Sequence, residues 1–224
     1  RALCLEGEKH LPEGAEICYG DVLDVSSLER FFSDIEDREV IVIHCAGVVS
    51  ISSKFDQRVF DVNVKGTKNV TDLCVAKNVK KLIYVSSVHA IREKPVGQVM
   101  TEPDVFDPEK VTGLYAKTKA EATRYVLAAV SRGLDAEVVF PSGIIGPYDY
   151  GRSHTNTMVS DYVNHRLVSA VKGGYDFVDV RDVADGIIAC AERGKPGEGY
   201  ILSGGYHSIK EILYDLHEIT GQKE

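Results

Sequence analysis

The stretch KLIYVSS, residues 81–87, is a short run of apolar and β-branched side chains that ends in two hydroxyls. Its apolar character is nearly continuous, which is typical of a strand covered by helices on both faces of a parallel sheet. Similar runs stand at 1–5 (RALCL), 15–19 (AEICY), 39–44 (EVIVIH) and 135–140 (DAEVVF). Segments of helical period lie between them, near 26–36, 56–78 and 115–132. The alternation predicts an α/β fold of the Rossmann type, a doubly wound parallel sheet with helices on its faces.

The texture changes after Pro141, where the segment PSGIIGPYDYGRSHTN is rich in glycine, proline and polar residues. Shorter elements are predicted beyond it: helices near 155–165, 181–192 and 208–220, and strands near 167–171, 176–179 and 199–202. We therefore place a dinucleotide-binding domain in residues 1–141 and a small substrate lobe in 142–224. The boundary stays open, because the strand at 176–179 and its helix could return to the main sheet.

Two predicted helices begin with the spacing of a capping box, in which a serine caps the helix and a glutamate follows three residues later. Ser26 and Glu29 have this spacing in the first helix, and Ser208 and Glu211 have it in the last. We expect both serines to be N-caps.

The composition is that of a soluble globular protein: 44% of the 224 residues are hydrophobic and 27% are charged. The net charge of −8 argues against nucleic acid or an anionic membrane as the main partner, since both attract basic faces. We interpret the basic cluster Lys77, Lys80 and Lys81 as a solvated helix end. The longest apolar run, around 40–51, is shorter than the roughly 20 residues of a membrane span, and His44 interrupts it. A cytoplasmic protein is expected.

The five cysteines are odd in number, far apart and mostly embedded in apolar runs. We expect them to be small buried hydrophobic residues in a reducing compartment. Neither they nor the seven histidines show a ligand spacing such as CxxC or HExxH, so no metal site is predicted.

The segment GLYAKTKAEATRYVL, residues 113–127, sets Tyr115 and Lys119 four residues apart on one face of a helix. An ammonium beside a phenol favours the phenolate, so it lowers a pKa that starts near 10. A tyrosine tuned in this way can pass a proton to or from a carbonyl or alcohol oxygen. Taken alone, the pair could also be two solvated side chains. The equally spaced Tyr206 and Lys210 are set aside, because a cap at Ser208 leaves Tyr206 outside the helix.

Small or polar residues follow three of the predicted strands, where a parallel sheet binds its ligands. They are Ser86 and Ser87 after one strand, Cys45, Ala46 and Gly47 after another, and Asp21 after a third. A strand-terminal serine can also bond the backbone, and an aspartate can form a turn. The three strand ends together with a Tyr-Lys helix indicate a cofactor crevice.

Seven stretches then carry a resemblance, in this order: GDVLDVSSLERFF, VIHCAG, VNVKGTKNV, LIYVSSVHA, YAKTKAE, FPSGIIGP and FVDVRDVADG. In these the chain resembles the extended short-chain dehydrogenase/reductase family, of the NAD-dependent epimerase/dehydratase type, over nearly its whole length. The resemblance implies that Tyr115 is the acid/base and that Lys119 tunes it and binds the nicotinamide ribose. It implies that Ser87 hydrogen-bonds the substrate oxygen and that Asn63 supports the lysine through water. Taken alone, Asn63 would be a helix residue satisfied locally.

The resemblance also implies NAD or NADP as cofactor, held by residues from several strand ends. These are Asp21 and Val22 at the adenine, Cys45, Ala46 and Gly47 along the ribose and phosphates, Ser86, Tyr115 and Lys119, and Pro141, Ser142, Gly143 and Ile144 at the nicotinamide. Phe140 stands where the family often has an arginine, so the role of that arginine in the family is not assigned to this position.

The family's glycine-rich loop, which cradles the pyrophosphate, precedes the strand on which this sequence opens. Since the missing first strand would be central in the sheet, we expect roughly 30 to 40 residues, one strand–helix step, to precede Arg1. The substrate lobe is expected to continue beyond its last helix. The choice between the cofactors stays open: Glu6 would repel a 2′-phosphate, whereas Arg1 or Lys9 would attract one.

The reaction implied is hydride transfer between nicotinamide and a carbon that bears oxygen. The stretches VSSVHAI and FVDVRDVADG are similar to dihydroflavonol-reductase-like and hydroxysteroid-dehydrogenase-like members, and Val88 and His89 stand where dehydratases tend to carry an Asp-Glu pair. A carbonyl reductase or alcohol dehydrogenase acting on a small molecule is therefore predicted. The alternatives are a nucleotide-sugar epimerase or dehydratase and, in another class, a non-catalytic dinucleotide-binding regulator.

Further contacts are expected from the loops. Tyr148, Tyr150, His154 and Asn156 are candidate substrate contacts, and His89 is either a contact or a solvated loop residue. The resemblance also suggests a homodimer formed through the helices near 56–78 and 115–132.

Overall fold

The computed structural model describes residues 1–11, 13–35, 38–52, 54–95, 97–151, 153–167 and 169–222. The chain divides into two compact units. The first contains Arg1–Phe140 and Ile187–Ile201, and the second contains Pro141–Gly186 and Leu202–Glu224. The chain crosses from one unit to the other within strand β5 (Ala136–Pro141), helix α6 (Val180–Arg193) and strand β8 (Gly199–Leu202).

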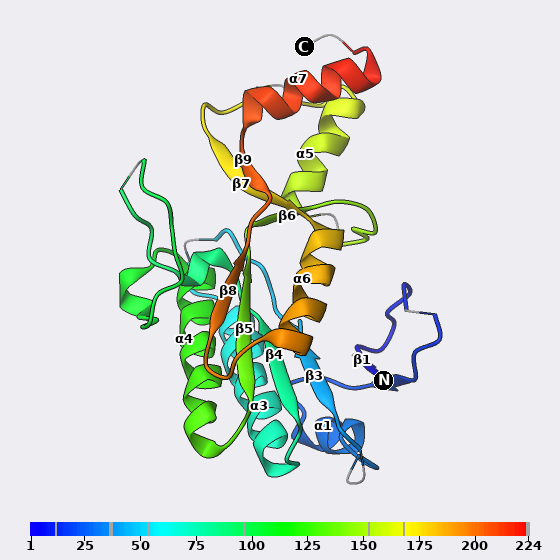
Figure 1. The fold of residues 1–224 in the computed structure, drawn as a ribbon. Coiled ribbons are helices and arrows are strands. Elements are labelled where there is room, and N and C mark those ends of the chain that lie inside the picture. The colour runs from blue at the N-terminus through cyan, green and yellow to red at the C-terminus, as the bar shows by residue number, and fades with distance from the viewer. Residues whose placement is uncertain are drawn as a thin grey trace. The chain divides into compact units, whose positions relative to one another are not determined.

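The first unit contains a four-stranded sheet in the order β3-β4-β5-β8 (Figure 1). Strands β3 (Ile41–His44), β4 (Lys81–Val85) and β5 run parallel, so their carboxyl ends lie at one edge. A separate parallel pair is formed by β1 (Ala2–Cys4) and β2 (Ile17–Tyr19). The α/β class predicted from the alternating pattern is confirmed.

The central strands are buried as their continuous apolar sequence predicts. Every residue of β5 is buried, and Leu82, Ile83 and Tyr84 of β4 have no exposed surface. The edge strand β3 differs, because Ile41 and Ile43 remain 44% and 47% exposed. Burial on both faces is thus confined to the middle of the sheet.

The helices of the first unit lie close to their predicted ranges. They are α1 (Val25–Phe31), α2 (Gln57–Phe60), α3 (Thr67–Ala76) and α4 (Leu114–Ala128). The predicted helix at 56–78 is continuous but contains a π-helical stretch, Asp61–Gly66, between α2 and α3. The predicted cap at Ser26 is wrong: Asp24 caps α1, and its side chain accepts a hydrogen bond from the Ser26 N–H. The capping box at Ser208 and Glu211 is confirmed at the start of α7 (Ile209–Thr220).

The second unit has its own three-stranded sheet of β6 (Gly143–Ile145), β7 (Gly174–Asp179) and β9 (Gly205–Ser208). Strand β7 runs parallel to β6 and antiparallel to β9, so the strand predicted at 176–179 does not join the main sheet. Helices α5 (His154–Val163) and α7 contact each other. The strand predicted at 167–171 is wrong for residues 167 and 169–171, and residue 168 lies outside the described residues.

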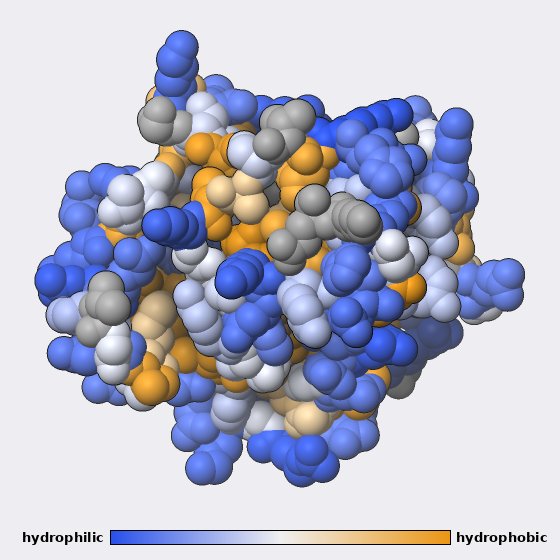
Figure 2. Space-filling model, turned by 90° about the horizontal axis from the view of Figure 1, so that it is seen from above, coloured by the Kyte–Doolittle hydropathy of each residue, from blue (hydrophilic) through white to orange (hydrophobic). Residues whose placement is uncertain are grey.

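Large hydrophobic side chains are exposed in both units, among them Ile51 and Phe55 in the first and Tyr214 and Ile219 in the second. Figure 2 shows hydrophobic side chains gathered within a mostly hydrophilic face. No helix among the described residues has the length and apolar character needed to cross a membrane.

The cysteines are unpaired. Cys74 and Cys190 are buried and Cys4 and Cys18 are partly buried, but Cys45 is exposed, against expectation. Cys45 is exposed because it directly follows β3 at the carboxyl edge of the sheet.

Candidate active site

Two serines end strand β4 and point to different partners. The Ser86 hydroxyl is buried and hydrogen-bonds Thr123 on α4 at 2.7 Å. The Ser87 hydroxyl accepts a hydrogen bond from the His89 N–H at 3.2 Å, which caps the short 3-10 turn Val88–Ala90. It also lies close enough to the Tyr115 phenol to lower the pKa of that group. A strand-terminal hydroxyl and the tyrosine of α4 therefore lie near each other.

Tyr115 is half-buried in the first turn of α4. Burial raises the pKa of its phenol, and the nearby Ser87 hydroxyl acts in the opposite direction. The tuning of this pKa by Lys119 stays a prediction, and the partners of the ammonium in this structure are the Val85 carbonyl and the Tyr84 hydroxyl. The phenol is protonated at neutral pH.

Lys119 lies one turn further along α4, and only 4% of it is exposed. Its ammonium donates to the backbone carbonyl of Val85 at 2.8 Å and to the Tyr84 hydroxyl at 3.3 Å. Burial lowers the pKa of Lys119 to about 8. The ammonium therefore sits at the end of β4, two residues before Ser87.

Asn63 occupies the π-helical stretch and is fully buried. Its side-chain amide donates to the Val48 carbonyl and to the Thr118 hydroxyl, both at 3.0 Å, and accepts from the Val48 N–H at 2.7 Å. The amide thus ties the loop after β3 to α4, next to Lys119. The support of Lys119 by Asn63 through water stays a prediction. In this structure the Asn63 amide bonds protein groups, as the alternative of a locally satisfied helix residue would require.

The loop Cys45–Gly47 is exposed and passes close to these groups. A Cβ added at Gly47 would lie 3.3 Å from the Asn63 amide oxygen and 3.4 Å from the Lys119 ammonium nitrogen. Glycine therefore lets the backbone approach both side chains while the outer surface of the loop stays open. A flat or extended ligand could lie along that surface.

Asp21 and Val22 follow β2 in the same unit. The Asp21 carboxylate accepts a hydrogen bond from the Leu23 N–H at 2.9 Å, so it forms the turn considered as its alternative role. Val22 is 7% exposed and belongs to the core. Their contact with an adenine stays a prediction.

The remaining predicted residues belong to the second unit. Pro141 and Ser142 are buried, and Gly143 and Ile144 form the start of β6. The buried Ser142 hydroxyl has no hydrogen-bond partner among the described residues. The role of these four residues beside a nicotinamide stays a prediction.

The candidate substrate contacts of the second unit differ in their surroundings. Tyr148 is 78% exposed, and Tyr150 is exposed as well. The Asn156 amide donates to Asp149 at 2.7 Å and lines a cavity of about 520 Å³ with Asp179 and Asp215. The side chain of His154 lies outside the described residues.

Two neighbours of the site were not predicted from the sequence. One is the contact between Tyr84 and Lys119, and the other is the position of His89, for which two roles stayed open. The His89 and Tyr115 rings lie edge to face with centroids 6.0 Å apart, so His89 belongs to the surroundings of the phenol. The sequence offered one signal for this position: His89 stands two residues after Ser87, at the same strand end.

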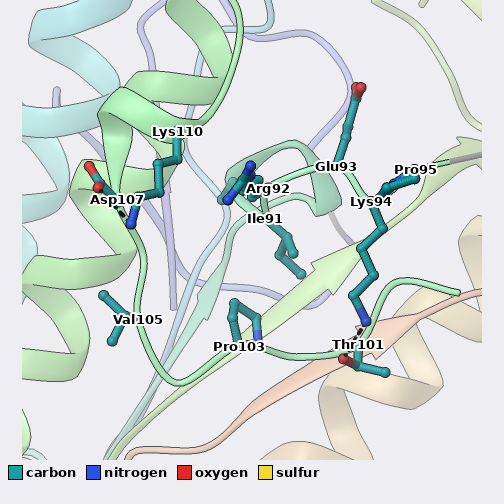
Figure 3. A pocket seen from close by; sticks show the side chains of 11 residues that line it. Ile91, Arg92, Glu93, Lys94, Pro95, Thr101, Pro103, Val105, Asp107 and Lys110 are labelled. Atoms are coloured by element: carbon teal, nitrogen blue, oxygen red, sulfur yellow. Dashed lines mark hydrogen bonds and ion pairs between the residues drawn. The ribbon is translucent and has the colours of Figure 1, made fainter. Parts of the chain in front are cut away.

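A cavity of about 500 Å³ begins at Ala90 and Ile91, just beyond His89. Figure 3 shows two extended segments that form its walls, joined by the hydrogen bond from Lys94 to Thr101 at 3.0 Å. Its lining combines charged and apolar side chains, among them Arg92. No group of three or more histidine, cysteine, aspartate or glutamate side chains suited to a metal ion occurs within the described part of the chain.

A parallel sheet covered by helices, with a serine, a tyrosine and a buried lysine near its carboxyl edge, is a fold of the Rossmann type. The profile of the NAD dependent epimerase/dehydratase family matches residues 3–203. The chain belongs to this family, and the resemblance stated from the sequence is confirmed. The family is NAD-dependent by its description, so the prediction of a nicotinamide dinucleotide cofactor is confirmed at this level.

Similar proteins cover most of the chain. Sterol demethylase protein B of Methylococcus capsulatus is 31% identical over 99% of this chain and 70% of its own length. A putative dihydroflavonol 4-reductase of Synechocystis is 33% identical over 80% of this chain and 54% of its own. The crystal structure of gox2253 aligns with a TM-score of 0.87 at 29% identity, over 99% of this chain and 67% of that one.

Proposed function

We propose that this protein is an NAD(P)-dependent oxidoreductase that transfers hydride between nicotinamide and a carbonyl or secondary-alcohol substrate. The observation that carries the proposal is that Ser87, the Tyr115 phenol and the buried Lys119 ammonium gather at the end of β4: the ring of His89, whose N–H bonds Ser87, lies against Tyr115, and Lys119 bonds the Val85 carbonyl. A hydroxyl, a phenol and an ammonium are the groups that bind a substrate oxygen and exchange a proton with it.

The protonation state of Tyr115 suits the direction of reduction. Because burial raises the pKa of the phenol, it holds its proton at neutral pH and can give it to a carbonyl oxygen as negative charge develops there. The Ser87 hydroxyl accepts from the His89 N–H, and its one proton, directed toward the Tyr115 oxygen in this structure, would turn to the same substrate oxygen when substrate binds. A bound nicotinamide dinucleotide would supply the hydride.

The residues around Lys119 fit such a cofactor. The exposed loop Cys45–Gly47 carries only small side chains, and its backbone approaches Lys119 and Asn63 closely. An ammonium with a pKa of about 8 is mostly charged at neutral pH and can donate to ribose hydroxyls. These residues do not distinguish NAD from NADP, and a homodimer through the α2–α3 and α4 region stays a prediction.

The names of several relatives favour a carbonyl or alcohol substrate. Among them are the putative dihydroflavonol 4-reductase, cinnamoyl-CoA reductase 1 of Oryza sativa at 31% identity and 3beta-hydroxysteroid-dehydrogenase/decarboxylase isoform 2 of Arabidopsis thaliana at 32%. The neutral pair Val88 and His89 after Ser87 agrees with this class. The sugar-nucleotide epimerases and dehydratases of similar fold are 18–24% identical, which supports the shared fold alone.

The test is NAD(P)H absorbance with a panel of aldehydes, ketones, steroid ketones and nucleotide sugars. Turnover is expected with a carbonyl substrate and should fall by roughly 10³-fold in Tyr115→Phe, while cofactor affinity stays within about twofold. Tyr125→Phe is the matched control, because Tyr125 lies on the same helix and its hydroxyl donates to Asp72. Equal activity of Tyr115→Phe and the wild type would remove Tyr115 from the mechanism.

A further inference from the structure

Tyr84 lies directly beneath the Lys119 ammonium. Its hydroxyl accepts from the ammonium at 3.3 Å, and the ammonium nitrogen lies 4.8 Å from the centroid of the Tyr84 ring. A cation near a ring face is attracted by the π-electrons, so one side chain offers the ammonium two acceptors. The Val85 carbonyl at 2.8 Å is the third.

Tyr84 has little freedom to move away. It is fully buried in the middle strand region of the sheet, and the His44 ring stacks on it at 5.4 Å with an interplanar angle of 24°. The Thr67 hydroxyl hydrogen-bonds His44 at 2.9 Å and lies close enough to the Tyr84 phenol to lower the pKa of that group. Tyr84 is therefore held by side chains from β3 and α3.

The groups around the ammonium are neutral at pH 7. Cys45 is the titratable group that acts on Lys119, and desolvation raises the pKa of its thiol, so the thiol keeps its proton there. In the described residues, none of the ion pairs includes Lys119. Burial, and then the Lys119 charge, lower the pKa of His44 to about 3, so the imidazole stays uncharged. Burial also raises the pKa of Tyr84, which keeps its phenol protonated. The ammonium depends on dipoles and a ring face where a carboxylate would usually stand.

We propose that Tyr84 is a positioning residue that fixes the Lys119 ammonium at the end of β4 and keeps it charged. The inference rests on the proposed function, in which Lys119 serves the reaction. His44 acts through Tyr84, because it stacks on the Tyr84 ring, and Thr67 acts through His44, whose imidazole it hydrogen-bonds.

The direct test follows the lysine by NMR. The protein is labelled with ¹³C at lysine Cε, the Lys119 signal is assigned by its loss in Lys119→Met, and its shift is titrated with pH. We expect the midpoint of Lys119 to fall by roughly one pH unit in Tyr84→Phe, which loses the hydroxyl but keeps the ring face. Tyr84→Leu loses both and should lower it further. Tyr125→Phe should leave it unchanged.

An unchanged midpoint in both Tyr84 variants would overturn the inference. Thermal unfolding of each variant separates a lost hydrogen bond from a disturbed core. If Tyr84→Leu does not fold, Thr67→Val serves in its place and should give a smaller fall of the same sign.

The pH dependence of turnover links the lysine to the reaction. In Tyr84→Phe the pH above which kcat declines should fall by the same amount as the NMR midpoint. If the Lys119 midpoint shifts in Tyr84→Phe but the wild type turns over no substrate, the proposed function is rejected. The conclusion that Tyr84 positions the Lys119 ammonium then still holds. Turnover whose pH profile is the same in Tyr84→Phe and wild type would reject the positioning role.

Discussion

Strand β4 has a buried lysine at each end, and the two are held in opposite ways. Lys81, its first residue, is 7% exposed, and its ammonium bonds Glu137 at 2.6 Å and the Gly194 carbonyl at 3.1 Å. Lys119 reaches the other end of the strand from α4 and bonds only the Val85 carbonyl and the Tyr84 hydroxyl within the described structure. One ammonium has a carboxylate partner and the other has neutral partners.

The difference appears in the two pKa values. Burial alone would lower the pKa of Lys81, but the hydrogen bond and charge of Glu137 outweigh it and raise the pKa. Burial lowers the pKa of Lys119 to about 8, and no carboxylate compensates. Lys81 is therefore permanently charged and structural. Lys119 is close to titration at neutral pH, which suits a group that acts on a ligand.

The variant Lys119→Met is expected to have the largest effect, and it tests whether Lys119 differs from Lys81 in serving activity more than stability. Turnover should fall by roughly 10³-fold, because the proposed reaction loses the charge at the end of β4, close to the Cys45–Gly47 loop. The free energy of unfolding should rise by ~1 kcal/mol or more, because a buried, uncompensated charge is removed. Steady-state assays and urea unfolding measure the two effects. If Lys119→Met is less stable than the wild type and still active, Lys119 has a structural role like that of Lys81.

Lys81→Met should have the reverse profile. Burial raises the pKa of Glu137 to about 7 even beside Lys81, so without the ammonium the buried carboxyl takes up a proton and loses its hydrogen-bond partner, which costs about 3 kcal/mol of stability. Lys81→Met combined with Glu137→Leu should recover most of this loss, because the buried carboxyl without a partner is removed as well. Urea unfolding of both variants, with activity measured at a temperature where each is folded, makes the test. Equal stability of the single and double variants would contradict it.

The pH dependence of stability sharpens the contrast further. The folded pKa of Lys119 is about 8 and its ordinary value is 10.5, so the unfolded chain binds more protons between these values. The stability of the wild type should therefore rise with pH across this window relative to Lys119→Met, by up to ~3 kcal/mol. Urea unfolding of both proteins at pH 7.5 and 10 gives the difference. A difference that is flat or falls with pH would refute the lowered pKa.

The smallest effect is expected from Asp135→Asn. Asp135 lies 3.5 Å from the Lys81 ammonium, but its side chain is 34% exposed and Glu137 is the nearer partner. The loss should be below about 1 kcal/mol, as for a solvated ion pair. Urea unfolding compares it with Glu137→Gln, which should cost more. Equal losses would show that the two carboxylates share Lys81.

Two short-range rules predicted where these side chains stand. Four-residue spacing places Tyr115 and Lys119 one turn apart on a helix, and parallel strands bring their carboxyl ends, with Ser87 after one of them, to one edge. Their joint role in a reaction came from the resemblance to the family and stays a prediction.

The environments of the lysines could not be predicted in the same way. Lys81 was interpreted as part of a solvated helix end, which is wrong, because it is buried as the first residue of β4. Its partner Glu137 comes from the neighbouring strand, and that pairing depends on a register the sequence does not state. Likewise, a continuous apolar strand does not reveal which face Tyr84 occupies.

The cap of α1 shows a local ambiguity of another kind. Asp24 and Ser26 are both good N-cap residues, and a glutamate three residues after Ser26 favoured the serine. In the structure the Asp24 carboxylate accepts from the Ser26 N–H, so the helix begins earlier, at Val25. Propensity alone does not separate two caps that stand two residues apart.

In the π-helical stretch Asp61–Gly66, the number of residues matters as well as their identity. Deleting one residue there would restore regular α-helical winding but rotate the preceding residues by about 100° about the helix axis relative to α3. Every side chain kept in such a shortened chain would retain its chemistry. Yet the amide of Asn63 would turn away from Val48 or from Thr118, and the loop after β3 would lose its fastening to α4. A frame-preserving deletion can thus disable this region as thoroughly as a substitution.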